Sequence, residues 1–374
     1  MKICFVVNEC SFFYSHRFQL AKKLASFTEI SLLTDTSGTK SDVIQKINEC
    51  NIYIHEVPRR TSKKGILGSY YYFKRLLHSI RLIKPDNIFF VTLEISFFGV
   101  IVSWFYRKVF CFYLITGLGP FFFNQTIKNK LVNLFLKTIF ISSRKRKNCK
   151  FIFQNNDNKE AFVKNNFISE NQSIVIPGSG IELDEINFKE RNGKNPLSFL
   201  FASRLVKSKG ISEFIEAGKI IKDIYPEVIL NIAGKFDPSD PEKISDTLFQ
   251  YIQDSTIFNY LGDMSYDEMQ LHYLDSDIFI LPSYAEGLPK SALEAAASGM
   301  PLILSKTSGC KECVVEDNNG FLVEIKDISS IKVAMEKIIA NPNLIPQMSQ
   351  NSRKLIKNKF SLKLIFNSYK KLVS

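Results

Sequence analysis

Short apolar runs recur along the chain, and helical stretches separate many of them. Most runs lack the apolar–polar alternation of a strand with one solvated face, so we expect strands that are buried on both faces. Such strands, alternating with helices, are typical of parallel sheets with helices on both sides. A first series comprises KICFVV, ISLLT, NIYIHEV, NIFFV, VFCFYLIT, FIFQN and SIVIP, and a second comprises LSFLFAS, VILNIAG, FNYLG, DIFILPS and PLILS.

The two series predict an α/β fold of two Rossmann-like domains that face each other across a cleft, with ligands at the carboxyl ends of the strands. A length of 374 residues fits two domains. Between the series lie a Pro-Gly-Ser-Gly run and a polar stretch, the composition of a linker. We expect a first domain at 1–176, a linker at 177–196, a second domain at 197–358 and a C-terminal helix at 359–374 that can pack back on the first domain.

One apolar segment is long enough to be taken for a membrane span. Residues 88–106 comprise 19 residues with one charge, Glu94. Because both flanks continue the alternation of strands and helices, we favour a buried strand, a turn and a buried helix. The N-terminus lacks the features of a signal peptide, and seven cysteines, an odd number spread along the chain, fit a reducing compartment. These features predict a cytoplasmic protein.

Two glutamates eight residues apart, Glu286 and Glu294, follow the apolar run DIFILP. Pro289 is placed to occupy the first turn of a helix that contains Glu294. The free N–H groups and positive end of such a helix can bind a diphosphate, and the carboxylates can accept hydrogen bonds from sugar hydroxyls. The alternative is an ordinary helix with surface glutamates, and spacing alone does not decide between them.

Basic residues follow the first strand of the second series. Arg204 and Lys209 belong to a strand-to-helix loop, so they can converge on a phosphate, Arg204 through its forked donors and Lys209 as a point charge. Taken alone, the same residues fit a solvated basic loop. Next to a helix N-terminus, the cationic pair favours diphosphate binding.

Several stretches resemble the family 4 retaining glycosyltransferases of the GT-B fold. They are FASRLVKSKGISEFIEA, NYLGDM, DSDIFILPSYAEGLPKSALEAAASGMPLI and GCKECVVEDNNGFLV. In the first half, FFYSHRFQLAKKL and LITGLGPFF resemble bacterial enzymes that extend lipid-linked O-antigen, capsule or glycan precursors. The resemblance covers essentially the whole chain. It implies sugar transfer from a nucleotide sugar, with UDP the expected nucleotide, to a polyprenyl-diphosphate-linked glycan in the biosynthesis of surface polysaccharide such as lipopolysaccharide.

The same resemblance implies roles for residues of the second domain. Arg204 and Lys209 would hold the diphosphate and stabilise the leaving group, Glu286 would contact the donor sugar, and Glu294 would accept the ribose hydroxyls. Retaining transfer of this kind is described as front-face displacement, in which the departing diphosphate assists the acceptor hydroxyl. It requires no strong base, and we expect no metal and no cofactor. Further contacts to the sugar, phosphate or base are expected from Gly287, Leu288, Gly262 and Met264.

The first domain offers candidates for the acceptor side. His16 is expected in the loop after the first strand, where it can orient an acceptor or a phosphate. Glu94 is expected at the end of the strand IFFVTLE, and Thr116 and Gly117 follow VFCFYLI, where a glycine lets backbone approach a ligand. A purely structural role is the alternative for all four.

Two motifs are rejected as metal sites. The string Asp275-Ser276-Asp277 precedes the strand IFILP instead of following it, so we expect a structural turn. Cys310 and Cys313 form a lone C-x-x-C pair without the further ligands of a zinc site or the sequence context of a redox pair.

Charge is distributed unevenly along the chain. Residues 1–165 contain 26 Lys and Arg against 10 Asp and Glu, a net charge of +16, and the remainder contains 23 against 27, a net charge of −4. Basic residues interleaved with aromatics at 59–75, and the basic stretch 128–150, suit an anionic membrane surface. The alternatives are nucleic acid, for which no motif is visible, and an ordinary solvated face. We expect peripheral attachment to the inner face of the cytoplasmic membrane, and no nucleic acid partner.

Two other functions stay open. A nucleotide-sugar 2-epimerase of the same fold would need acid/base carboxylates and histidines, and the chain has only 4 histidines. The second is a catalytically silent scaffold at the membrane surface. The presence of both glutamates and the Arg/Lys pair argues against it.

Overall fold

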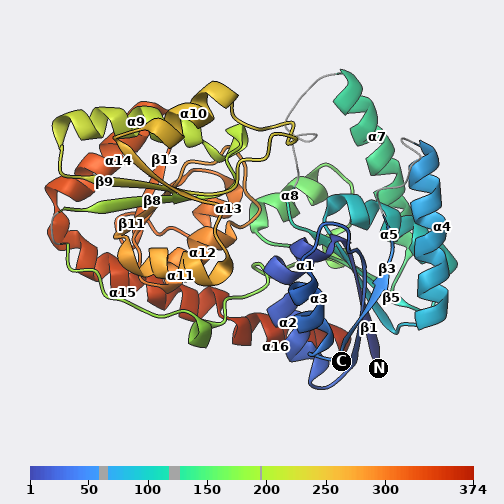
Figure 1. Cartoon of the computed structure of the whole chain (residues 1–374). Coiled ribbons are helices and arrows are strands. Elements are labelled where there is room, and N and C mark those ends of the chain that lie inside the picture. The colour runs from blue at the N-terminus through green and yellow to red at the C-terminus, as the bar shows by residue number, and fades with distance from the viewer. Residues whose placement is uncertain (59–65, 118–126, 194–195) are drawn as a thin grey trace. The chain divides into compact units, whose positions relative to one another are not determined.

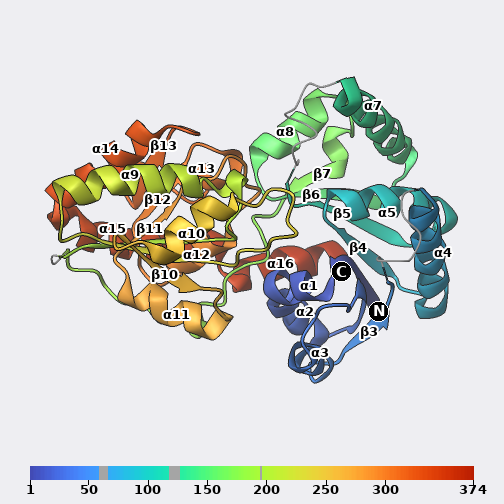
Figure 2. The ribbon, with the colours of Figure 1, turned by 45° about the horizontal axis from the view of Figure 1, so that its top comes forward.

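The computed structural model divides into two compact units, each a layered α/β structure (Figures 1 and 2). The first unit comprises Met1–Gly180 and Leu362–Ser374, and the second comprises Ile181–Ser361. The chain therefore leaves the first unit once and returns to it at its C-terminus. The structure describes all residues except 59–65, 118–126 and 194–195.

The described residues of the first unit form a sheet of seven parallel strands: β1 (Lys2–Glu9), β2 (Glu29–Asp35), β3 (Ile52–Glu56), β4 (Asn87–Val91), β5 (Phe110–Ile115), β6 (Cys149–Phe153) and β7 (Ser173–Val175). Their order is β3-β2-β1-β4-β5-β6-β7. Successive residues of β1 enter different cores, because Ile3 and Phe5 pack in one cluster and Cys4 and Val6 in another. The sheet is thus buried on both faces, which explains the unalternated apolar sequences of its strands.

Helices cover both faces of this sheet: α1 (Cys10–His16), α2 (Phe18–Ala25), α3 (Ser41–Asn48), α4 (Ile66–Ile83), α5 (Leu93–Phe105), α7 (Ile127–Ser142), α8 (Asn156–Lys164) and α16 (Leu362–Val373). Side chains of α1, α2, α3 and α16 belong to one core cluster, and side chains of α4, α5, α7 and α8 belong to the other. In α16, Leu362, Ile365 and Tyr369 are buried, and the Tyr369 ring lies 5.5 Å from that of Phe89 in β4. The C-terminal helix is part of the core of the first unit.

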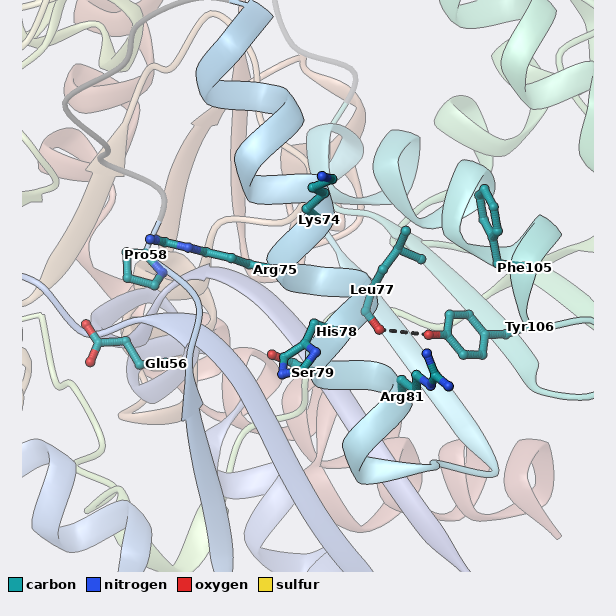
Figure 3. A pocket seen from close by; sticks show the side chains of 10 residues that line it. All are labelled: Glu56, Pro58, Lys74, Arg75, Leu77, His78, Ser79, Arg81, Phe105 and Tyr106. Atoms are coloured by element: carbon teal, nitrogen blue, oxygen red, sulfur yellow. Dashed lines mark hydrogen bonds between the residues drawn. The ribbon is translucent and has the colours of Figure 1, made fainter.

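The apolar segment 88–106 forms β4 and α5, as predicted. Between them, Thr92 caps α5 by accepting a hydrogen bond from the backbone N–H of Ile95 (3.4 Å). After α5, the Tyr106 hydroxyl donates to the carbonyl oxygen of Leu77 in α4 (2.7 Å; Figure 3). No helix in the described part of the chain combines the length and the apolar character that crossing a bilayer requires.

The described residues of the second unit form a sheet of six parallel strands: β8 (Ser198–Ala202), β9 (Ile229–Ala233), β10 (Phe258–Gly262), β11 (Ile278–Leu281), β12 (Leu302–Ser305) and β13 (Gly320–Val323). Their order is β10-β9-β8-β11-β12-β13. All residues of β8, β11 and β12 are buried. This sheet also lies between helical layers (Figure 1).

The helices of the second unit are α9 (Ile211–Ile224), α10 (Asp246–Asp254), α11 (Tyr266–Asp275), α12 (Lys290–Ala297), α13 (Ser308–Lys311), α14 (Ile328–Ala340) and α15 (Ile345–Leu355), and a π-helical turn follows at Ile356–Phe360. In α9 the residues Phe214, Ile215 and Ile221 are buried, whereas Ile220 and Ile224 are exposed. Not all isoleucines of α9 therefore face the core.

The segment that the sequence assigns to a linker extends across the division between the units. Arg191, within it, is buried in the second unit. Its guanidinium donates to the carbonyl oxygens of Lys189, Tyr273, Ser276 and Ser298. This part of the segment therefore packs as an element of the second unit.

Candidate active site

In both sheets the strand order reverses direction at one pair of neighbours, β1 and β4 in the first unit and β8 and β11 in the second. In open α/β sheets, ligands bind next to the carboxyl ends of strands at such reversal points. The predicted site residues are concentrated in the segments that follow these strands. Each unit thus presents one candidate region.

In the second unit, the loop after β8 (203–210) is fastened to the loop after β11 (282–289). The backbone N–H of Tyr284 donates to the carbonyl oxygen of Ser208 (2.8 Å), and its hydroxyl donates to Glu213 in α9 (2.6 Å). Gly210 has φ +72°, and a Cβ there would collide with the carbonyl oxygen of Pro282. Only glycine fits this close approach, which holds the two loops together.

The predicted residues Lys209 and Glu286 meet across these loops. The Lys209 Nζ lies 2.6 Å from the Glu286 Oε1, and the two side chains are 21% and 10% exposed. The carbonyl oxygen of Glu286 also accepts a hydrogen bond from the backbone N–H of Gly309 (3.1 Å). A Cβ on Gly309 would lie 2.5 Å from the carbonyl oxygen of Gly287, so the loop after β12 fits tightly under the predicted site residues.

Glu294 is not the surface glutamate of the alternative interpretation, because it is buried in α12 with 7% of its surface exposed. Its Oε2 accepts a hydrogen bond from the Tyr273 hydroxyl (3.3 Å), and its Oε1 lies 2.9 Å from the Lys290 Nζ. Burial raises the pKa of Tyr273 well above its usual value, and the Glu294 carboxylate raises it further. Tyr273 therefore stays a neutral donor that holds the carboxylate in place.

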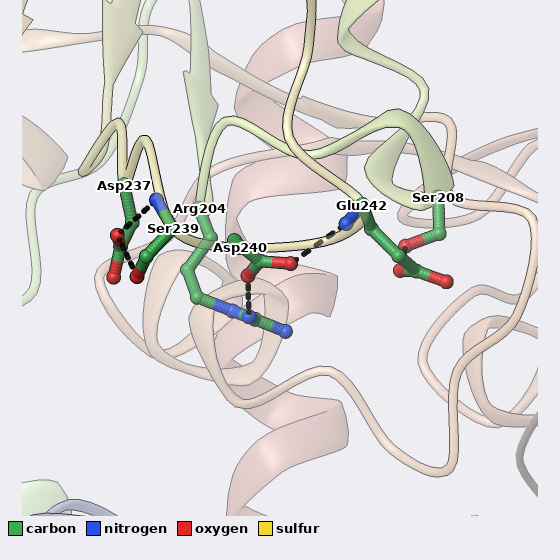
Figure 4. A network of polar contacts seen from close by, with 6 residues as sticks. All are labelled: Arg204, Ser208, Asp237, Ser239, Asp240 and Glu242. Carbon is green, nitrogen blue, oxygen red and sulfur yellow. Dashed lines mark hydrogen bonds and ion pairs between the residues drawn. The ribbon is translucent and has the colours of Figure 1, made fainter.

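Arg204 lies on the same loop as Lys209 but has a different partner. Its side chain is 65% exposed, and its guanidinium forms an ion pair with Asp240 in the loop between β9 and α10 (2.8 Å; Figure 4). In that loop the Glu242 carboxylate accepts a hydrogen bond from the Ser208 hydroxyl (2.6 Å). Arg204 and Lys209 are thus each bonded to a separate carboxylate, and the convergence predicted for them stays a prediction.

The acidic loop that contains Asp240 and Glu242 is absent from the sequence interpretation. Two features indicate it in retrospect: the acidic run DPSDPE at 237–242 follows the strand run VILNIAG, and β9 neighbours β8 in the sheet. Loops after neighbouring parallel strands meet at one edge. An acidic run there places carboxylates next to the predicted phosphate-binding cations.

Backbone hydrogen bonds and packing against the core position the remaining predicted residues of the second unit. Gly262 ends β10 with φ +87°, and its carbonyl oxygen accepts a hydrogen bond from the backbone N–H of Gly234 (2.8 Å). Met264 and Leu288 are half-buried, with side chains packed against the core of this unit. Their anchoring fixes the backbone of the segments on which they lie.

In the first unit, His16 does not lie in a loop, because it is the last residue of α1. The strand ends at Glu9, and burial of Cys10 and Phe13 folds the following residues into a helix. The His16 ring stacks on Phe12 with 4.3 Å between centroids, and its Nδ1 lies 2.7 Å from the Ser15 hydroxyl. The ring is therefore held by its own helix.

Glu94 lies in the first turn of α5, not at the end of a strand, because Thr92 interrupts the segment and caps the helix. The Asn8 side-chain amide donates to the exposed Glu94 carboxylate (3.4 Å), which joins the end of β1 to the first turn of α5. Thr92 has φ +86°, a rare conformation for a β-branched residue and one that marks functional sites. Thr116 and Gly117 follow the neighbouring strand β5 and are half-buried.

Asn8 and Thr92 are further candidates that the sequence interpretation does not include. The Asn8 Oδ1 is buried and makes no hydrogen bond within the described residues, so it can accept one from a ligand. The position of Asn8, at the polar end of the first apolar run, is the signal that sequence reasoning could have used. No sequence feature indicates the positive φ of Thr92.

The two rejected motifs have structural roles. Asp277 precedes β11, and its carboxylate accepts hydrogen bonds from the backbone N–H (2.9 Å) and hydroxyl (2.8 Å) of Ser198. Cys310 and Cys313 are buried thiols, and burial raises the pKa of Cys310 to about 12. Across the described residues, no His, Cys, Asp and Glu side chains form a group that could hold a metal ion.

Comparison with known proteins shows similarity to glycosyltransferases. Residues 183–355 match the family model described as "Glycosyl transferases group 1". The chain is 28% identical over 300 residues, which cover 77% of it and 76% of the relative, to an N,N'-diacetylbacillosaminyl-diphospho-undecaprenol alpha-1,3-N-acetylgalactosaminyltransferase of Campylobacter jejuni. It is 29% identical over 251 residues, which cover 64% of it and 63% of the relative, to a UDP-Gal:alpha-D-GlcNAc-diphosphoundecaprenol alpha-1,3-galactosyltransferase of Escherichia coli.

A solved structure supports the fold over the whole length. HepE of Anabaena, in complex with UDP-glucose, superposes with a TM-score of 0.80 at 17% identity and covers 99% of this chain and 98% of its own. Identity this low is evidence for the fold alone. The second unit is thus similar to the group 1 glycosyl transferases, and the chain as a whole has the GT-B fold.

Proposed function

We propose that this glycosyltransferase is a retaining enzyme of family 4 that transfers a sugar from a UDP-linked donor to a glycan on polyprenyl diphosphate, in the biosynthesis of surface polysaccharide. Two relatives act, by their names, on glycans linked to undecaprenyl diphosphate, and the name of one includes a UDP-sugar donor. We place the enzyme at the inner face of the cytoplasmic membrane.

The observation that best supports this proposal is the arrangement of Lys209, Glu286 and Glu294 in the second unit. Lys209 and Glu286 pair across two loops that are fastened together at the reversal point of the sheet, and Glu294 lies one turn into the helix that follows. A cation, two carboxylates and a helix N-terminus are the groups that a diphosphate and a ribose require. A solvated basic loop does not bury a lysine–glutamate pair in this way.

The chemistry needs stabilisation of the leaving group more than a base. As the bond between the anomeric carbon and the diphosphate oxygen breaks, negative charge develops on that oxygen, next to Lys209, Arg204 and the first turn of α12. The acceptor hydroxyl attacks from the same face, and its proton passes to the departing diphosphate. We propose that the protein's cations alone supply this stabilisation, without a metal ion.

Glu286 and Asp240 would then change partners during turnover. Each forms an ion pair with a cation that the donor diphosphate would need, Lys209 and Arg204 respectively. Donor binding would free the Glu286 carboxylate to accept hydrogen bonds from sugar hydroxyls. In the first unit, Asn8, His16 and Glu94 would face the acceptor.

The test is a donor screen with a polyprenyl-diphosphate-linked acceptor in detergent, followed by mass spectrometry of the glycolipid product. We expect release of UDP from one donor sugar, transfer in the presence of EDTA, and a product with the anomeric configuration of the donor. A product of opposite configuration would exclude the retaining mechanism, and loss of transfer with EDTA would exclude the metal-free one. Isomerisation of the donor without acceptor would favour an epimerase, and absence of UDP binding by calorimetry would favour a silent scaffold.

A further inference from the structure

The C-terminal end of α5 exposes large aromatic side chains, although most of this helix is apolar and buried. Trp104 is 46% and Phe105 is 65% exposed. Figures 1 and 2 show α4 and α7 as neighbours of α5. Both helices expose apolar residues: Leu67, Tyr70, Tyr71, Leu82, Leu134, Phe135 and Ile141. Exposed apolar side chains that gather on neighbouring helices favour contact with a partner or a membrane.

One basic pocket lies on the α4 side of this helix end. The α4 pocket has a volume of about 830 Å³ and is lined by α4, by the segment after β3 and by Phe105 and Tyr106 (Figure 3). Its cations are Lys74, Arg75 and Arg81. Tyr106 is fastened to α4 by its hydrogen bond to Leu77, so the helix end forms a fixed wall of the pocket.

A second basic pocket lies on the α7 side of the same helix end. The α7 pocket has a volume of about 610 Å³, and Trp104 forms part of its lining. Arg146 donates to the carbonyl oxygens of Ser103 and Tyr106, which fixes this pocket to α5 as well. Its four cations are Arg107, Lys145, Arg146 and Lys147.

Within the described part of the chain, none of the seven cations in the two pockets forms an ion pair with a carboxylate. Lys74 instead lies over the Tyr70 ring, 5.0 Å from its centroid. Glu56 is the one acidic residue among the lining residues of the two pockets. Among the described residues, the cations of both pockets thus have no ion-paired carboxylate, on either side of Trp104 and Phe105.

We propose that this surface docks the protein on an anionic phospholipid bilayer, with phosphate headgroups in the α4 and α7 pockets and with Trp104 and Phe105 inserted between them. Lys and Arg form charge-assisted hydrogen bonds with phosphate, and aromatic rings partition to the boundary of headgroups and acyl chains. The surface thus offers cations for the phosphate headgroups of a bilayer and aromatic rings for the boundary between its headgroups and acyl chains. This docking surface makes the proposed peripheral location specific. Only its biological purpose rests on the proposed function.

Charge and apolarity together favour a bilayer over other anionic partners. A nucleic acid backbone would neutralise the cations but leave Leu82, Phe105 and Leu134 in water. The proposed surface includes cations of both basic stretches expected from the sequence, Lys74 and Arg75 of 59–75 and residues 145–147 of 128–150. It adds the end of α5, whereas 59–65 of the first stretch lies outside the described residues.

Trp104 is the only tryptophan of the chain, so its fluorescence reports directly on this surface. We expect a blue shift of its emission and protection from a soluble quencher when the full-length protein is mixed with vesicles of phosphatidylglycerol and phosphatidylcholine in equal parts. Vesicles of phosphatidylcholine alone should cause neither change. Equal responses to both vesicles, or no response to either, would overturn the proposal.

Variants test the two parts of the surface separately, with binding measured by cosedimentation. Lys145→Gln combined with Lys147→Gln should weaken binding about thirtyfold, from about fivefold for each cation near an anionic surface. Phe105→Ser, which keeps the fluorescent reporter, should weaken it about tenfold. All substituted side chains are exposed, so the thermal unfolding temperature should not change.

The matched controls lie on exposed positions of the second unit. Lys354→Gln with Lys357→Gln removes the same charge, and Leu271→Ser removes a side chain that is 62% exposed. Both should bind vesicles like the wild type, and an equal loss in controls and test variants would refute the docking surface. Vesicle binding without any sugar transfer would refute the proposed function alone, whereas transfer in detergent without vesicle binding would refute only the docking.

Discussion

At the scale of single residues, the ion pair between Lys209 and Glu286 makes the sharpest prediction about activity. Lys209→Met removes a cation from the leaving diphosphate and leaves Glu286 without its partner. We expect kcat to fall by about two to three orders of magnitude, as when one preorganised donor of a developing negative charge is removed. The measurement is steady-state UDP release with the identified donor.

Lys207 is the matched control for this variant, because it lies on the same loop with an exposed side chain. Lys207→Met should keep kcat within the error of the wild type. If both variants lose activity equally, the loop acts through its fold or its total charge, and the assignment of Lys209 to the leaving group fails.

Gly309 tests whether its close packing against the loop after β11 matters for stability and for UDP binding. In Gly309→Ala the new Cβ would meet the carbonyl oxygens of Gly287 and Glu286 at 2.5 and 2.7 Å, so the backbone of the β11 loop must move. We expect a loss of about 1–3 kcal/mol in the free energy of unfolding, as for other overpacked sites, and weaker UDP binding. Ser308→Ala, one residue earlier, should change neither quantity. Denaturant unfolding and calorimetry measure the two effects.

The sequence could predict which residues follow the strands but not how they pair. Lys209, Glu286 and Glu294 are in the expected segments because strand ends are marked by the end of an apolar run. The carboxylate that pairs with Arg204 comes from a loop 36 positions later, and the donor to Glu294 comes from a different helix. Such partners are set by tertiary packing, which local pattern does not contain. For the same reason the sequence predicts His16 in a loop and Glu94 at the end of a strand, whereas they lie in the helices α1 and α5.

At the scale of elements, strands were easier to predict than the segments between them. A strand buried on both faces is a continuous apolar run, and this feature indicates twelve strands. The strand Gly320–Val323 is missed because it opens with glycine and not because it is short, since β7, β11 and β12 are no longer than it is. Helix faces are harder to predict, because in α9 the isoleucines Ile220 and Ile224 are exposed although others of the same helix are buried. The polar stretch that composition assigns to a linker contains the buried Arg191. Composition does not show which polar side chain donates hydrogen bonds to buried carbonyl oxygens.

That arginine supports a prediction about stability. Arg191→Ala would leave the carbonyl oxygens of Lys189, Tyr273, Ser276 and Ser298 without a donor in a buried site. We expect a loss of at least about 3 kcal/mol in the free energy of unfolding, since each unsatisfied buried group costs about 1–3 kcal/mol. Glu190→Gln, at the exposed neighbouring position, is the control. A wild-type unfolding midpoint for Arg191→Ala would mean that this segment contributes no stability.

At the scale of the whole molecule, the chain crosses from the first unit to the second and returns with α16. The turn at Gly180, with φ +84°, packs directly against Leu362 at the start of that helix. Both passages between the units therefore lie at one place in the first unit. The sequence indicated a terminal helix from the spacing of its apolar residues, but the surface that it covers depends on how distant strands are ordered in the sheet.

Removal of α16 should therefore unfold one unit and spare the other. Truncation after Ser361 uncovers the places of Leu362, Ile365, Tyr369 and Val373, and at about 1.5–3 kcal/mol for each buried side chain the loss approaches the whole stability of a domain. We expect hydrogen exchange, followed by mass spectrometry, to show lost protection in β1, β2 and β4 and native protection in β8, β11 and β12. Leu364→Ser, on the outward face of α16, should preserve protection in both. Loss of protection in the second unit as well would show that the two units fold as one.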